Sequence, residues 1–176
     1  MNEDRILYNG WHKVESIQHN GQNYEKLHIK SAVAGIVTDL TGSIALVEQF
    51  RPALNTYTYE IPAGVIDKPI SNQDILYEEL AEECYIASED IISCQSALIP
   101  SYDMIGGSSD AVLHLYRVHA NIVGQDMPIE DDTDVIRIMW VSLDELKLMI
   151  MNGKIKDAKT IMASFLLNNE QGGFYA

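Results

Sequence analysis

Residues 73–86 read QDILYEELAEECYI, a helical pattern with a strongly acidic face. Glu79, Glu82 and Glu83 stand at positions i, i+3 and i+4, so they share one side of the helix, and Glu78 joins them one residue earlier. Like charges four residues apart destabilise a helix by about 0.2–0.5 kcal/mol per pair, and this helix contains no Lys or Arg to relieve them. Such a face is either a solvated surface or a binding site for a hard cation such as Mg²⁺ or Mn²⁺.

The segments around this helix predict an α/β fold in which helices cover a sheet. Ser71 and Ser142 are each followed three residues later by an acidic residue, which is typical of a helix start. Helices are expected at 71–84, from 142 to just before Gly153, and at 156–167. Strands are expected at 11–18, 24–29, 32–38, 43–50, 56–61, 91–99, 111–119 and 135–141. The first two strands surround an Asn-Gly turn and can form a small sheet of their own.

The composition limits the classes of function. The 176 residues are enough for one domain, and 47% are hydrophobic and 22% charged, as in globular proteins. Asp and Glu number 26 against 12 Lys and Arg, a net charge of −14, which argues against partners such as nucleic acids and anionic membranes. Cys84 and Cys94 have no metal-ligand spacing. With no secretory signal and no run of about 18 apolar residues, we expect a cytoplasmic protein with reduced thiols.

The run from Gly64 to Ile86 resembles the Nudix box. In this motif, a glycine and a glutamate are followed at fixed intervals by the cluster R-E-U-x-E-E, where U is a bulky aliphatic residue. A second glycine and a final bulky aliphatic residue complete the box. The length matches without a gap. Gly64 takes the first glycine, Glu79 the glutamate after the arginine, Glu82 and Glu83 the paired glutamates, and Ile86 the last aliphatic position.

The flanking segments are similar to the ADP-ribose pyrophosphatase branch of the Nudix hydrolases. The matching stretches are VEQFRP at 47–52, YEIPAGVID at 59–67, the Gly-Gly-Ser-Ser-Asp loop at 106–110 and GKIKDAKTIMA at 153–163. The resemblance implies a Nudix-like α/β/α sandwich with a mixed sheet over residues 31–176. It also implies a small N-terminal antiparallel β unit over residues 1–30 that helps to form a homodimer.

The resemblance further implies hydrolysis of the pyrophosphate bond of a nucleoside diphosphate-sugar with Mg²⁺ or Mn²⁺ as cofactor. ADP-ribose, giving AMP and ribose 5-phosphate, is the first expectation. The implied metal ligands are Glu79, Glu82, Glu83 and the carbonyl of Ala63, and Glu79 and Glu82 also count as catalytic.

The implied substrate contacts are Arg51, for a phosphate, and Glu60. The family's general base lies on an acidic loop, here residues 129–134, where Asp132 and Asp134 match by position. Both are one methylene shorter than the usual glutamate, and Glu130 is the alternative base.

Three positions depart from the box. Ile70 replaces a glutamate, Glu78 replaces the arginine and Tyr85 replaces the second glycine. Loss of both charged members avoids stranding one of them, but it leaves the orientation of Glu79 without its usual support. Tyr85 would be strained if the helix ends with a positive φ. The alternative to a hydrolase is therefore a weak or inactive Nudix domain that binds a nucleotide ligand.

Overall fold

The computed structural model describes residues 5–10, 12–129 and 135–170, and it contains two sheets and three α-helices. The strands are β1 (Arg5–Asn9), β2 (Lys13–His19), β3 (Gln22–His28), β4 (Ala32–Thr38), β5 (Ile44–Arg51), β6 (Thr56–Glu60), β7 (Ala63–Val65), β8 (Ile91–Asp103), β9 (Val112–Ala120), β10 (Met127–Pro128) and β11 (Val135–Val141). The helices are α1 (Asn72–Cys84), α2 (Leu143–Met151) and α3 (Ala158–Glu170), with a short 3₁₀ turn at Ser88–Asp90.

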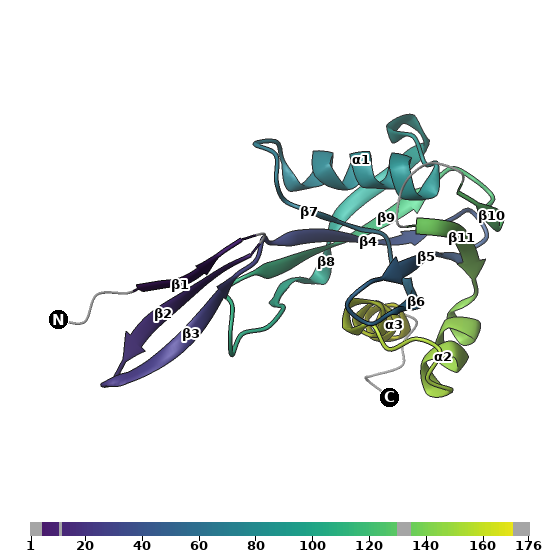
Figure 1. Ribbon diagram of the computed structural model, residues 1–176. Coiled ribbons are helices and arrows are strands. Elements are labelled where there is room, and N and C mark those ends of the chain that lie inside the picture. Colours follow the sequence, from purple (N-terminus) through teal and green to yellow (C-terminus); the bar gives the residue numbers. More distant parts are fainter. Residues whose placement is uncertain (1–4, 11, 130–134, 171–176) are drawn as a thin grey trace.

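The main sheet is mixed and has eight strands. Six run in the order β10-β11-β5-β4-β9-β8, while β6 pairs with β5 and β7 pairs with β4. The pairing of β4 with β9 is parallel and the other pairings are antiparallel. Figure 1 shows α1 on one face of this sheet and α2 and α3 on the other, so the expected α/β/α sandwich with a mixed sheet is confirmed.

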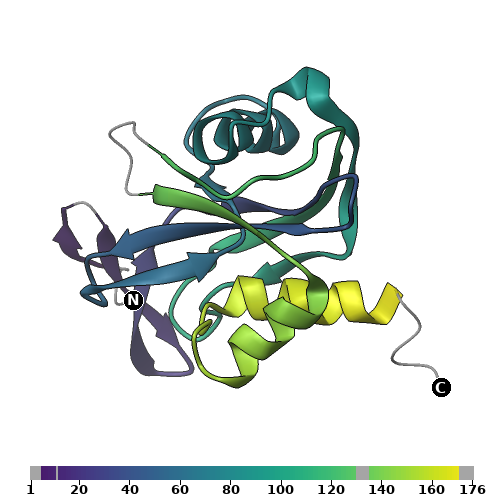
Figure 2. The same cartoon turned by 90° about the vertical axis from the view of Figure 1, so that its right-hand side faces the viewer.

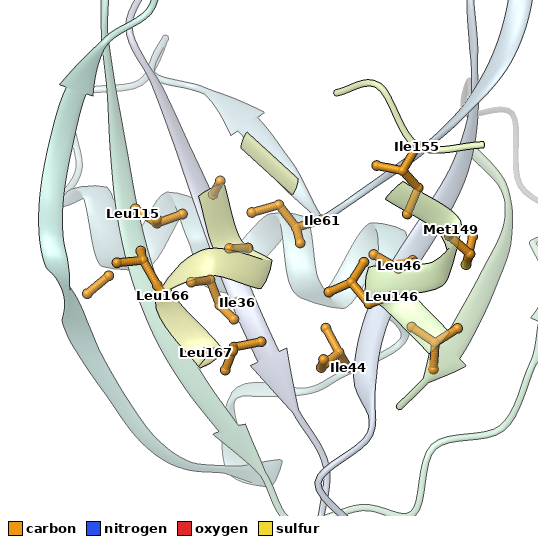
Figure 3. Close-up of a cluster of buried hydrophobic side chains, with 14 of the residues drawn as sticks. Ile36, Ile44, Leu46, Ile61, Leu115, Leu146, Met149, Ile155, Leu166 and Leu167 are labelled. Carbon is orange, nitrogen blue, oxygen red and sulfur yellow. The ribbon is translucent and has the colours of Figure 1, made fainter. Parts of the chain in front are cut away.

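Alternating side chains of β4 and β5 supply two separate cores. Val33 and Val37 pack with Ala45, Val47 and α1 in one core. The intervening residues face α2 and α3, where they form the larger core drawn in Figure 3. Its members include Ala34, Ile36, Ile44, Leu46, Leu146 and Leu166. The near-continuous apolar runs of β4 and β5 follow from this arrangement, because a central strand with helices on both faces is buried on both sides.

The N-terminal unit has three strands, whereas the sequence predicted two. Strands β1, β2 and β3 form an antiparallel sheet of their own, which projects from the sandwich in Figure 1. Every residue of β1 is exposed, so the segment shows no alternation of buried and exposed positions from which a strand could be predicted. The hairpin at Asn20-Gly21 is present as expected, with φ of 49° and 78° at the two turn residues.

The main sheet also differs from the sequence prediction, in the length of β8 and in two short strands. β8 was expected to end at Ile99 but continues to Asp103, with a register irregularity between Ser96 and Ser101 that contains Pro100. A proline cannot donate a ladder hydrogen bond, so it interrupts the pairing locally, and the strand resumes beyond it. The two-residue strand β10 and the three-residue strand β7 were not predicted, since segments this short carry no periodicity.

The helix starts agree with the predicted caps. The Ser71 hydroxyl accepts a hydrogen bond from the amide of Asp74 at 3.1 Å, and Ser142 does the same for Glu145 at 3.2 Å. Helix α3 begins two residues later than expected because Asp157 caps it: one Asp157 oxygen accepts from the Thr160 amide at 2.9 Å. None of the helices within the described residues is long and apolar enough to cross a membrane.

Tyr85 caps the C-terminal end of helix α1, with φ 55° and ψ 32°, and is 46% exposed. The amides of Tyr85 and Ile86 both donate to the carbonyl of Leu80. This is the left-handed conformation in which a side chain is disfavoured by about 1–2 kcal/mol, and the expectation of strain at position 85 is confirmed.

Replacing Tyr85 with glycine should therefore stabilise the fold. We expect Tyr85→Gly to raise the free energy of unfolding by about 0.5–1 kcal/mol, after allowing for the greater freedom of glycine in the unfolded chain. Urea denaturation measures this difference. Tyr85→Ala is the matched control: it removes the ring but keeps the Cβ, so it should bring no gain. A stabilised alanine variant would show that the ring, and not the backbone conformation, is the source of strain.

Candidate functional site

The first box glycine leaves room for the carboxylate of Glu79 against the backbone of β7. A Cβ built on Gly64 would lie 2.1 Å from the carboxyl carbon of Glu79, closer than real side chains approach one another. Gly64 lies in β7, so the half-buried Glu79 carboxylate of α1 packs directly on the backbone of this strand. The box spacing thereby brings a carboxylate of the helix onto the edge of the sheet.

Glu83 lies one turn further along α1 and is the most buried of the acidic cluster, with 7% of its surface exposed. Its Oε2 accepts a hydrogen bond from the amide of Ala63 at 3.2 Å. Burial first, and then the charge of Glu79, raise the pKa of Glu83 to about 8, against the opposing effects of the Ala63 amide, Lys159 and Arg51. The pKa of Glu79 is also raised, by burial and then by Glu82, while Lys68 lowers it.

These raised pKa values give a chemical reason to expect a cation here. Two carboxylates that are crowded together and partly removed from water resist ionisation, and a divalent cation relieves both effects. Within the described ranges, no group of three or more His, Cys, Asp or Glu side chains is already arranged to hold a metal ion, and Glu82 is exposed. The donor set fits a hard cation that keeps several waters as ligands. The assignment of Ala63, Glu79, Glu82 and Glu83 as ligands remains a prediction.

A second charged cluster lies around Glu60, at the end of β6. Arg51 donates to both Glu60 oxygens, from Nε at 2.7 Å and from Nη2 at 2.6 Å, in a bidentate pair. Thr58 donates to Oε1 at 2.6 Å, and the Lys159 ammonium also pairs with this carboxylate. Burial alone would raise the pKa of Glu60, but these contacts lower it to about 2. Glu60 is therefore a permanently charged anchor between two cations.

Lys159 is a component of this cluster that the sequence prediction missed. Asp157 accepts from the Thr160 hydroxyl at 2.6 Å, and that hydroxyl in turn accepts from the amide of Ile61 at 2.9 Å. This chain of hydrogen bonds fixes the start of α3 beside the end of β6 and brings Lys159 to Glu60. The only signal in the sequence was the Asp-Ala-Lys-Thr run within the segment similar to the branch's C-terminal helix.

Arg51, Glu60 and Lys159 lie along a cavity of about 510 Å³, and the two predicted substrate contacts are thus brought together. The cavity is large enough for part of a nucleotide-sugar. Both Arg51 and Lys159 lower the pKa of Glu83, which places the cationic cluster within electrostatic reach of the acidic helix. The remaining lining residues are Ala53, Leu54, Thr58, Tyr102, Met104, Leu113, Lys156, Asp157 and Ala158.

The predicted general bases lie outside the described residues. Asp132, Asp134 and the alternative Glu130 belong to the segment 130–134, between β10 and β11. Figure 2 shows the ends of the strands on either side of this segment.

Comparison with known proteins supports the resemblance found in the sequence. No family model matches the chain. A methanol dehydrogenase activator from Bacillus methanolicus is 28% identical over 146 residues, which cover 82% of this chain and 76% of that protein. An ADP-ribose pyrophosphatase from Bacillus subtilis is 26% identical over 162 residues, covering 92% and 80%. A GDP-mannose pyrophosphatase from Yersinia enterocolitica is 31% identical over 132 residues, covering 69% and 64%.

The chain resembles the Nudix hydrolases. The resemblance drawn from the box and its flanking segments is confirmed by these relatives at low identity. Two of the three are named as pyrophosphatases and one as an activator, and the comparisons agree with the resemblance at the level of the family.

The pKa of Glu83 makes a specific prediction for stability without divalent cations. A carboxyl group with a folded-state pKa near 8 and an ordinary unfolded value of 4.5 binds more protons when folded, so its contribution to stability falls as the pH rises between those values. In EDTA, we expect wild type to lose roughly 1 kcal/mol per pH unit more than Glu83→Gln across this range. The glutamine retains an acceptor for the Ala63 amide.

Denaturation with urea at several pH values measures this difference. The exposed Glu89→Gln variant is the control and should follow the wild-type dependence on pH. Parallel curves for wild type and Glu83→Gln would show that the Glu83 carboxylate is not held in an unfavourable environment.

Proposed function

We propose that the protein is a divalent-cation-dependent Nudix pyrophosphatase that acts on a nucleoside diphosphate-sugar. The observation that carries the proposal is that the acidic face of α1 lies within electrostatic reach of two basic side chains that line a cavity. Glu79 and Glu83 provide a place for a cation, and Arg51 and Lys159 line the adjoining cavity. A pyrophosphate linkage needs both, since its negative charge has to be balanced before a water molecule can attack.

The residues have distinct parts in the proposed reaction. Arg51 keeps 40% of its side chain exposed at the cavity, so it can contact a phosphate while Glu60 fixes its orientation. Glu79, Glu83 and Glu82, with the Ala63 carbonyl, would hold Mg²⁺ or Mn²⁺. The bound ion would supply charge neutralisation and lower the pKa of the attacking water. Asp132 or Asp134, or Glu130 in their place, would accept the proton of that water.

The names of the relatives guide the choice of substrates to test. ADP-ribose is the first candidate, with AMP and ribose 5-phosphate as products, and GDP-mannose is the second. Water attacks one phosphorus atom and the P–O–P bridge breaks, so each product carries one phosphate group.

A hydrolysis screen with either Mg²⁺ or Mn²⁺ tests the proposal. We expect wild type to cleave at least one nucleoside diphosphate-sugar, and we expect Glu79→Gln and Glu83→Gln to lower kcat/KM by roughly 100-fold or more. Loss of groups that only support metal ligands already costs about 10–100-fold. Titration with Mn²⁺, followed by electron paramagnetic resonance, should show weaker binding in both variants. Glu89→Gln removes one charge from an exposed position and should match wild type in both measurements.

The second candidate function is nucleotide binding without efficient hydrolysis. It is favoured by Ile70, Glu78 and Tyr85 in the box and by the relative named as an activator. Saturable binding of ADP-ribose, with no cleavage of any tested nucleotide-sugar at high Mg²⁺ or Mn²⁺ concentration, would favour this function over the hydrolase.

We also propose that the protein is a homodimer formed through its N-terminal sheet. A small sheet needs an apolar face that is covered to be stable, and β1 exposes Ile6, Leu7 and Tyr8 by 53%, 42% and 59%. A second copy of the chain would cover these side chains.

Light scattering at micromolar concentration should give a mass of about twice 19.7 kDa. Ile6→Asp should shift the protein toward the monomer, because a charge would enter the covered surface. Val123→Asp, at a position that is 62% exposed on the main domain, is the matched control and should remain dimeric. A mass of one chain for wild type would overturn this proposal.

A further inference from the structure

One of the two box positions that lost their expected charges, Glu78, takes part in a different ion pair. Lys68 lies in the loop between β7 and α1, and its ammonium group pairs with Oε2 of Glu78 on the helix. The resemblance implies a glutamate at position 70 and an arginine at position 78. Here the helix supplies the negative group and the loop supplies the positive one, two residues before Ile70. The loop and the helix are thus joined with the polarity of the pair reversed.

We propose that Lys68 is a positioning residue for Glu79, acting through its ion pair with Glu78. The inference rests on the proposed function, since it assigns to Lys68 the support that the altered box otherwise lacks. Lys68 is not proposed to contact the substrate.

The geometry of the segment from Gly64 to Lys68 carries this inference. Glu79 packs on Gly64 at the start of the segment, and the neighbouring Glu78 holds Lys68 at its end. Two consecutive helix residues therefore contact both ends of one short stretch of chain. Between them, the amide of Ile66 donates to the carbonyl of Ser31 at 2.9 Å, which ties the same stretch to the start of β4. Movement of the loop at Lys68 would change the surface on which Glu79 rests.

The charged groups around Lys68 are consistent with its proposed role as a positioning residue for Glu79. Its pKa is raised first by the hydrogen bond to Glu78 and also by the charges of Glu82 and Asp67, and Lys68 in turn lowers the pKa of Glu79. The pair is exposed, with 54% of the Lys68 side chain and 44% of the Glu78 side chain accessible. Exposed pairs contribute little to overall stability, so breaking this one should affect the site much more than the fold.

Two neutralising variants separate positioning from a simple charge effect. Lys68→Gln removes a positive charge near Glu79, whereas Glu78→Gln removes a negative one. If only charge matters, Mn²⁺ affinity rises in the first variant and falls in the second. If the pair positions Glu79, both variants bind Mn²⁺ more weakly, by roughly 2- to 5-fold, since an exposed ion pair contributes no more than this. The double change Lys68→Glu with Glu78→Arg keeps a pair and should recover most of the affinity.

Lys147→Gln is the matched control, because Lys147 pairs with Asp144 at 3.6 Å on α2, away from the box. It removes the same charge and should leave Mn²⁺ affinity unchanged. Opposite shifts in Lys68→Gln and Glu78→Gln, or no shift in either, would overturn the proposal while leaving the pyrophosphatase assignment intact.

Hydrogen exchange provides a readout that needs no metal and no activity. The amide of Ile66 should exchange faster in both single variants and return to the wild-type rate in the charge-reversed double variant. If Ile66 keeps its protection in both single variants, Lys68 does not hold this loop, whatever the outcome of the hydrolysis screen. Failure of wild type to bind Mn²⁺ would instead count against the proposed function alone.

Discussion

The contact of two α1 carboxylates with the backbone of β7 is the constraint on which the site depends. Glu79 packs on Gly64, and Glu83 accepts a hydrogen bond from the amide of Ala63, so both carboxylates lie directly against the strand backbone. The same helix buries Leu76 and Leu80 against the main sheet, and this apolar packing supplies the free energy that keeps the acidic groups partly out of water. The apolar packing on one side of α1 thereby compensates for the crowded carboxylates on the other side.

An acidic protein can accept a phosphate-bearing molecule where bound cations or basic side chains offset its negative charge. Basic side chains lie beside Glu60, where Arg51 approaches from β5 and Lys159 from α3. Thr160 connects α3 to the chain after β6, so the cation cluster depends on the same packing of helix against sheet as the larger core does. The acidic cluster belongs to α1, whereas the second cluster is built from the sheet and from α3, and its two cations lower the pKa of Glu83.

Most of the fold could be predicted from local patterns. The buried runs of β4 and β5 and the serine caps of α1 and α2 carry strong signals, because burial and capping constrain the residue types that can occur there. Strand β1, the continuation of β8 beyond Pro100 and the short β7 could not be predicted in this way. Their formation depends on pairing with neighbouring strands, and their own residues show no periodic burial.

The sequence by itself determined that Glu79, Glu82 and Glu83 share one helix face, that Gly64 precedes them at the box spacing and that Tyr85 stands where a glycine is expected. Helical periodicity and residue identity are local properties, so no coordinates are needed for them. Only the tertiary structure decided that Lys68 pairs with Glu78, that Lys159 reaches Glu60 across 99 positions of sequence, and that Glu83 is buried enough to raise its pKa to about 8. These features depend on which surfaces the folded chain brings together, because pairing and desolvation are set by neighbours in space.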